Sequence, residues 1–179
     1  DVDELYNAIG KLQIICITLE HDDNAQLIFE SLNSTGLALT EGDKIRNYIL
    51  MGLNPQEQNA CYENYWAKIE KNAGKDVSSF VRDYLSIKQH STPTISKVYQ
   101  VFKNYVEDGQ IPLNTLMQDM LDYARIYKKI TSGKSCENNK ELDDCLYRLN
   151  RLEITVAEPF FMQVFYLYEK EKKLCLEDL

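Results

Sequence analysis

Four residues in one short stretch are the strongest candidates for chemistry in this sequence: Glu30, Asn33, Gly36 and Arg46. Asn33 offers an amide, and Glu30 a carboxylate that could orient a water molecule or a metal ion. Arg46 carries a planar guanidinium group, which can bind phosphate through two parallel hydrogen bonds. The stretch is predicted to contain a helix end, a tight turn and a helix start. Such a corner exposes backbone N–H groups, which can bind an anion or be capped by nearby side chains.

Two helices are expected to position these side chains. Apolar residues recur at helical spacing in residues 27–32, and the N-S-T-G stretch at 33–36 should end that helix. Gly36 can adopt the left-handed conformation that closes a helix. Thr40 then caps a second helix, with Asp43 three positions later as a short capping-box acid. The candidate residues are therefore expected on a helix-turn-helix corner.

Each candidate also has a structural interpretation. The Asn33 amide either contributes to a nucleotide or phosphate pocket, or ties down the turn in which it lies. Glu30 either helps to orient a metal ion or water, or is solvated on an exposed helix face. Arg46 either contacts phosphate or pairs with Asp43 or Asp22, and the sequence favours the ion pair.

Other candidate sites are weaker. His21-Asp22-Asp23 could bind a metal, but capping and the helix dipole explain two acids before a helix. Glu153 and Glu158 are five positions apart, a spacing that predicts different helix faces and no carboxylate pair. The cysteines form no C-x-x-C pattern and are interpreted as reduced cytosolic thiols; they are Cys16, Cys61, Cys136, Cys145 and Cys175.

The same corner resembles a bacterial family. The signature F-E-x-L-N-S-x-G-x-x-L-x-x-x-D-x-I-R-N-Y-x-L is matched by Phe29-Glu30, Leu32-Asn33, Gly36, Leu39, Asp43, Ile45-Arg46-Asn47-Tyr48 and Leu50. This pattern is similar to that of the N-terminal domain of GmrSD-type restriction proteins, the domain of unknown function family 262. The match is dense over residues 19–53 and continues more loosely through Tyr65-Trp66, Phe80 to Leu85 and Lys97-Val98-Tyr99.

The resemblance implies a ParB-like, nucleotide-hydrolysing core joined to a helical region and often followed by an HNH nuclease domain. The hallmark D-G-Q-Q-R motif is expected upstream of the signature and is absent. The similar stretch Asp108-Gly109-Gln110 is not this motif, since it is followed by Ile111-Pro112 and lies downstream of the signature. Only two histidines are present, His21 and His90, too few for an HNH site. Neither of the family's catalytic motifs is therefore found in this sequence.

The predicted function is that of a non-catalytic helical fragment of a modification-dependent, phage-defence restriction protein. It would frame a nucleotide pocket through Asn33, Gly36, Arg46 and Glu30. The resemblance implies a nucleoside triphosphate and magnesium as cofactors of the parent protein, and none in the fragment. The expected partners are the ParB-like core and the nuclease domain of the same protein. The alternative is a stand-alone helical protein-interaction module with no nucleotide or DNA role.

Composition is that of a cytoplasmic globular protein. The 179 residues suit one domain, perhaps with a subdomain, and contain 44% hydrophobic and 27% charged residues. The net charge of −8 and the scattered lysines and arginines argue against direct DNA binding by the chain. No apolar run approaches the length of a membrane span.

The predicted fold is mainly α: an irregular bundle of about seven or eight helices with one N-terminal strand. Leu12–Leu19 is β-branched and apolar on both faces, which predicts a strand inside a covered sheet, paired with the ParB-like core or with a second copy. Residues 1–53 are assigned to the edge of that core and residues 54–179 to the helical bundle. The apolar stretch Ile154–Lys170 is predicted to be the central helix of the bundle.

The starts of three further helices are predicted at Asn54, Asp76 and Asn114, residues whose side chains can cap a helix. Apolar residues recur at helical spacing over 80–87, 95–106 and 116–127, which predicts one buried face for each of these segments.

Overall fold

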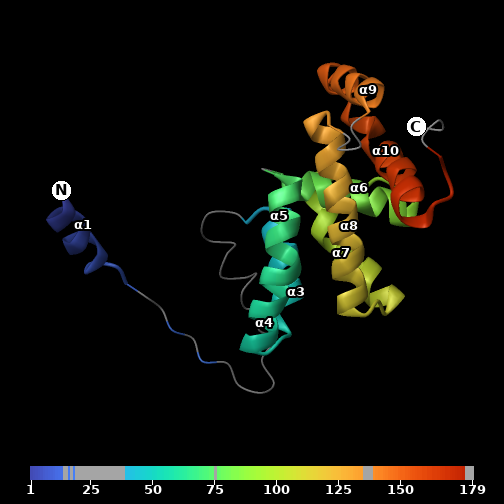
Figure 1. Cartoon of the computed structure of the whole chain (residues 1–179). Helices are drawn as coiled ribbons and strands as arrows, with labels where there is room; N and C mark the ends of the chain where they lie inside the picture. The colour runs from blue at the N-terminus through green and yellow to red at the C-terminus, as the bar shows by residue number, and fades with distance from the viewer. Residues whose placement is uncertain (14–15, 17, 19–38, 75, 135–138, 176–179) are drawn as a thin grey trace. The chain divides into compact units, whose positions relative to one another are not determined.

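A computed structural model describes residues 1–13, 16, 18, 39–74, 76–134 and 139–175 (Figure 1). The mainly helical fold is confirmed across these residues. The chain divides into two compact units, Asp1–Gly36 and Leu37–Leu179.

In the first unit, the described residues contain one helix, α1 (Val2–Ile9). A capping box starts it, in which the Asp1 side chain accepts from the backbone of the first turn and Glu4 bonds back to the cap. Its apolar side chains recur at helical spacing and are all exposed; they are Val2, Leu5, Tyr6 and Ile9.

The predicted strand Leu12–Leu19 is not found. Its described residues, Leu12, Gln13, Cys16 and Thr18, lie in no strand, and the other residues of the segment lie outside the described part. A run of apolar and β-branched residues gives a local preference only, whereas a strand needs a neighbouring strand to satisfy its backbone hydrogen bonds. The described part of the chain contains no such neighbour.

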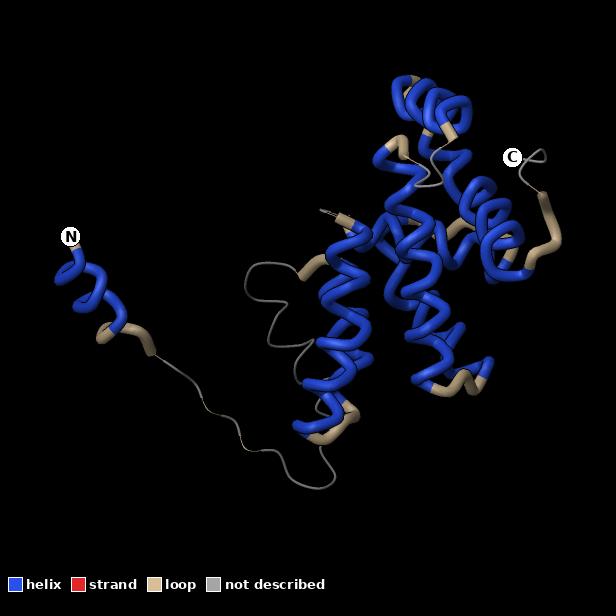
Figure 2. The backbone as a smooth tube through the Cα atoms, in the orientation of Figure 1, coloured by secondary structure: helices blue, strands red, loops and turns tan. Residues whose placement is uncertain are grey.

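The second unit is a bundle of helices (Figure 1). The elements, in chain order, are α3 (Glu41–Met51), α4 (Pro55–Cys61), the π-helical turn η1 (Tyr62–Trp66), α5 (Ala67–Ala73), α6 (Val77–Gln89), the 3₁₀ turn η2 (Ile95–Lys97), α7 (Val98–Gly109), α8 (Leu113–Ser132), α9 (Lys140–Arg151), the 3₁₀ turn η3 (Thr155–Ala157), α10 (Glu158–Tyr166) and the π-helical turn η4 (Leu167–Glu171). Figure 2 shows α4, η1 and α5 as one continuous helical tube. Helix α3, which the sequence grouped with the N-terminal segment, belongs to this second unit.

Side-chain caps start three of the helices where the sequence predicted them. Thr40 and Asp43 form a capping box at α3, and Asn54 and Glu57 form one at α4. Asp76 accepts from the Ser79 N–H at the start of α6. The sequence predicts Asn114 as the cap of α8, but this helix begins at Leu113, and Pro112, two residues earlier, occupies the cap position. The Pro112 carbonyl accepts the Leu116 N–H at 3.0 Å, so Asn114 already lies within the first turn.

Helix α8, and not the predicted Ile154–Lys170 segment, is the central helix of the bundle. Figure 1 shows α8 between α5 and α10, both of which pack on it. Nine α8 side chains are buried: Leu116, Met117, Met120, Leu121, Tyr123, Ala124, Ile126, Tyr127 and Ile130. In α10 only Met162 and Phe165 are buried, whereas Phe160 is 65% exposed. Helix α10 is apolar nearly all round, yet one apolar side of it is exposed. Hydrophobicity alone therefore does not determine which helix lies at the centre of the bundle.

Candidate functional site

Three of the four candidate residues from the sequence, Glu30, Asn33 and Gly36, lie outside the described residues. Their proposed contacts with a nucleotide stay predictions. The predicted helix end at 33–36 and the His21-Asp22-Asp23 segment lie outside as well. The fourth candidate, Arg46, lies on α3 and is described.

Arg46 is held by two carboxylates of its own chain. Its Nη2 lies 3.1 Å from Asp43 Oδ1, and its Nη1 lies 3.2 Å from Glu70 Oε1. Glu70 also accepts the Trp66 indole N–H at 2.6 Å. The Arg46–Glu70 contact joins α3 to the helix formed by α4, η1 and α5. The sequence offers Asp43 or Asp22 as the ion-pair partner of Arg46; the pair with Asp43 is present, and Asp22 lies outside the described residues. A role in phosphate binding stays a prediction.

Three backbone N–H groups at the start of α3 donate within the chain. Thr40 Oγ1 accepts the Asp43 N–H at 3.1 Å, and Asp43 Oδ2 accepts the Thr40 N–H at 3.2 Å. The Gly42 N–H donates to Ser78 Oγ at 3.0 Å in a buried bond. Of the two uses foreseen for these N–H groups, anion binding and mutual capping, the described half of the corner shows capping.

A buried carboxylate, Asp83, with a half-buried second carboxyl group, Glu158, is the most unusual arrangement of charged groups in the described part of the bundle. Asp83 on α6 is only 1% exposed. Its Oδ1 accepts from the Arg82 guanidinium, with both Nε and Nη2 at 3.0 Å. Its Oδ2 is buried and, while Glu158 is ionised, has no hydrogen-bond donor among the described residues. Glu158, the first residue of α10, interacts with this carboxylate.

The two carboxyl groups alter each other's proton affinity. Burial raises the pKa of Asp83, against the lowering effect of the Arg82 charge. Burial is also the main cause that raises the pKa of Glu158 to about 7, followed by its hydrogen bond to Asp83 and the Asp83 charge. A protonated Glu158 carries the O–H that can donate to Asp83 Oδ2. The pair is thus able to hold one proton near neutral pH.

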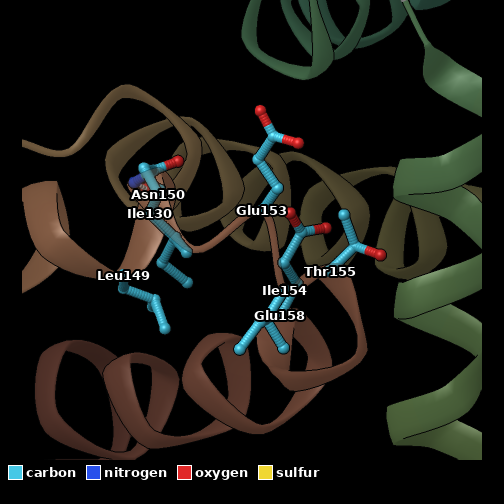
Figure 3. A pocket seen from close by; sticks show the side chains of 7 residues that line it. All are labelled: Ile130, Leu149, Asn150, Glu153, Ile154, Thr155 and Glu158. Carbon is cyan, nitrogen blue, oxygen red and sulfur yellow. Dashed lines mark hydrogen bonds between the residues drawn. The ribbon is translucent and has the colours of Figure 1, made fainter.

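Glu158 also lines a pocket of about 190 Å³ (Figure 3). In this view Leu149 and Asn150 lie on one side of the pocket and Glu153 and Thr155 on the other. The Asn150 amide is fixed by donating to the Ile130 and Leu146 carbonyls, at 2.6 and 2.9 Å.

The prediction that Glu153 and Glu158 point to different faces of one helix was wrong, because one helix does not contain both. Helix α9 ends at Arg151, and Glu153 adopts a left-handed conformation with φ 52°. The turn η3 then leads into α10, so that both glutamates line the same pocket. The partner that interacts with Glu158 is nevertheless Asp83 and not Glu153.

A second, apolar groove of about 300 Å³ lies between α9 and α10. Its lining combines side chains from the two helices and the residue that follows α9; they are Leu142, Cys145, Leu146, Arg148, Leu149, Leu152, Phe161 and Phe165. Leu152 and the nearby Phe160 are 64% and 65% exposed. This surface carries no paired acid and base suited to catalysis.

Two kinds of site are not found in the part of the chain that the structure describes. No group of three or more His, Cys, Asp or Glu side chains there could hold a metal ion. None of the described helices combines the length and the apolar character needed to cross a membrane.

Sequence reasoning missed the Asp83–Glu158 pair, although one signal was available. Asp83 lies three residues after Phe80 and four before Ile87, within the apolar stripe of α6. An acid at a core position of an amphipathic helix needs a partner, because burying an unpaired charge is costly. This signal identifies a buried acid, but it does not identify Glu158 as the group that faces it.

Comparison of the chain with protein-family models, with curated proteins and with solved structures found no match.

Proposed function

We propose that the chain is the non-catalytic helical part of a GmrSD-like restriction protein, in which the bundle supports the signature corner beside a nucleotide pocket. The nucleotide contacts would come from Asn33, Glu30 and Gly36, with Arg46 supporting the corner from α3. The ParB-like core and the nuclease domain of the parent protein would supply the catalytic groups. A nucleoside triphosphate and magnesium would bind in the parent.

The observation that carries the proposal is the attachment of α3, the second half of the signature, to the bundle. Glu41 Oε2 accepts the Tyr99 backbone N–H at 2.8 Å, which joins α3 to α7. The Gly42 N–H bond to Ser78 joins it to α6, and the Arg46–Glu70 pair joins it to α5. Three separate elements thus fix one helix. A helix held in this way can keep an adjoining turn in a constant position, which precise ligand contacts require.

The first experiment tests whether the chain is non-catalytic. The purified 179-residue chain would be incubated with GTP, ATP and plasmid DNA in the presence of Mg²⁺. We expect neither nucleotide hydrolysis nor DNA cleavage, since the family's catalytic motifs are absent from the sequence. Turnover that stays with the protein through a second purification would contradict the proposal.

The second experiment uses the full-length parent protein and compares Asn33→Ala with Asn54→Ala. Asn54 is a matched control because its side chain accepts the Glu57 N–H at 2.9 Å and so caps α4. Losing a cap or a turn hydrogen bond costs about 1 kcal/mol of stability. Losing a preorganised contact to the transition state costs roughly 3 kcal/mol in rate.

We therefore expect Asn54→Ala to lower the melting temperature with little effect on turnover. Asn33→Ala should lower nucleotide turnover far more than it lowers the melting temperature. The proposed pocket would be wrong if both variants lose stability and turnover in the same proportion, and if nucleotide leaves the wild-type melting temperature unchanged.

A stand-alone protein-interaction module is the second candidate. The exposed apolar side chains around the α9–α10 connection favour it; they are Leu152, Ile154, Val156 and Phe160. The genomic sequence upstream of Asp1 discriminates between the two functions. A D-G-Q-Q-R motif in the same reading frame supports the GmrSD-like parent, and a start codon directly before Asp1 supports the stand-alone module.

A further inference from the structure

The carboxylates of Asp83 and Glu158 interact across two helices that pack against each other, α6 and α10. Arg82 occupies only one oxygen of Asp83, and the other oxygen is buried without an ordinary donor in the described structure. With both carboxyl groups ionised, the interface would hold an unpaired buried acceptor and two neighbouring negative charges, and both are unfavourable. One proton on the pair removes the repulsion and supplies the absent donor.

We propose that Asp83 and Glu158 share one proton that fastens α10 to α6, and that loss of this proton loosens α10. The proposal goes beyond the function suggested above, because it concerns the stability of a helix and requires neither a nucleotide nor a parent protein.

The other charged and titratable groups around the pair modulate the effect but do not replace it. Arg82 on α6 favours the ionised form of both acids, whereas the Asp76 charge at the start of α6 opposes ionisation of Asp83. Tyr127 on α8 also faces the pair. Burial, followed by the charges of Glu158 and Asp83, raises the pKa of Tyr127, so this residue stays neutral at physiological pH.

A further acidic side chain, Glu153, lines the same pocket as Glu158. Within α10 itself, Glu158 is the only acidic or basic residue. Among the described residues, the charges that affect the proton shared by Asp83 and Glu158 therefore come mainly from α6.

The direction of the pH effect follows from where the proton binds. In the folded chain the pKa of Glu158 is raised from 4.5 to about 7, with burial as the main cause. An unfolded chain releases this proton at the ordinary value. Between these two pH values the folded state binds more protons than the unfolded state, so stability falls as the pH rises through this window. The raised pKa of Asp83 acts in the same direction.

Loosening α10 would also change the apolar groove. Phe161 and Phe165 of α10 form part of its lining, opposite Leu142 and Leu146 of α9. A change in the position of α10 therefore alters the shape of this groove. The carboxyl pair would thus link proton concentration to an apolar surface to which the same helix contributes.

The first test follows thermal unfolding of the full chain between pH 5.5 and pH 8 for the wild type, Glu158→Gln and Glu153→Gln. Gln has the shape of protonated Glu, and its amide can donate to Asp83 at every pH. We expect the wild-type melting temperature to fall by roughly 3–6 °C over this range, and Glu158→Gln to lose most of the fall. Glu153→Gln should behave like the wild type. A Glu158→Gln variant with the same pH dependence as the wild type would overturn the proposal.

The second test measures amide hydrogen exchange in the wild-type chain at pH 6 and pH 8, after correction for the intrinsic pH dependence of exchange. We expect the protection of α10 to fall at least threefold relative to that of α8. Unchanged relative protection would show that the proton does not fasten α10. A ¹³C carboxyl titration of the wild type keeps the proposal testable if the variants do not fold. A Glu158 midpoint in the ordinary glutamate range would overturn it.

Discussion

Lys88 Nζ lies 2.8 Å from Asp119 Oδ2 and, at the same time, over three tyrosine rings. The ring centroids of Tyr84, Tyr123 and Tyr166 lie 5.3, 4.6 and 5.7 Å from this nitrogen. Asp119 also accepts the Tyr84 hydroxyl at 2.6 Å. A lysine of α6, an aspartate of α8 and tyrosines of α6, α8 and α10 thus form one cluster, which holds the three helices together.

We expect Lys88→Met to lower the free energy of unfolding by about 2 kcal/mol. Cation–π contacts contribute about 0.5–2 kcal/mol, and the substitution also leaves a half-buried Asp119 without its counter-ion. Lys128→Met is the control, because Lys128 lies exposed on α8. Urea denaturation of both variants provides the measurement. Equal midpoints for Lys88→Met and Lys128→Met would show that the cluster adds nothing to stability.

Gly42→Ala should destabilise the bundle by about 1–3 kcal/mol, the usual cost of overpacking. A Cβ atom at position 42 would lie 3.1 Å from Val77 Cβ, where α3 packs closely on the start of α6. Gly52→Ala is the matched control, since its Cβ would meet no atom within 4 Å. We expect this control to be neutral or slightly stabilising. Thermal unfolding compares the two, and a stable Gly42→Ala chain would contradict the close approach of the helices.

Two phenylalanines of α10 should respond very differently to substitution. Phe165 is 2% exposed, and Phe165→Ala should cost about 3–5 kcal/mol of stability through the cavity it leaves. Phe160 is 65% exposed, and Phe160→Ala should cost under about 1 kcal/mol, mainly its ring contact with Phe161. Chemical denaturation of the two variants measures the difference. Similar losses for both would mean that α10 buries a different face.

The Cys61 thiol should react slowly with maleimides at pH 7.5. It is 8% exposed, and burial raises its pKa, so little thiolate is present at the surface. Cys145 is exposed and serves as an internal reference. We expect Cys145 to be labelled on the order of tenfold faster, as followed by peptide mass spectrometry. Faster labelling of Cys61 would indicate that α4 opens readily in solution.

The helix starts were the part of the fold that local sequence predicted best. The caps at Thr40, Asn54 and Asp76 are present as predicted, because a cap involves residues within one turn of each other. The ion pair between Arg46 and Asp43 is of the same kind, since its partners are three residues apart on one helix. Contacts between residues within one helical turn can be predicted from their spacing in the sequence.

The second contact of Arg46 cannot be predicted from spacing in the sequence. Its second partner, Glu70, comes from another helix, and so does the hydrogen bond from Gly42 to Ser78. The strand prediction for Leu12–Leu19 failed in the described residues for a related reason. Strand formation depends on a neighbouring strand, and a run of apolar, β-branched residues carries no information about whether that neighbour exists.

The sequence by itself determined that the described chain is mainly helical, where several helices begin, and which faces of α6, α7 and α8 are apolar. These properties depend on hydrogen bonds and burial within a few residues. Only the tertiary structure decided that α8 is central, that Lys88 meets Asp119 and that Asp83 faces Glu158. Each of these pairings joins residues of different helices. It depends on how the helices pack, because a side chain's burial and charge environment are set by neighbours that are distant in the sequence.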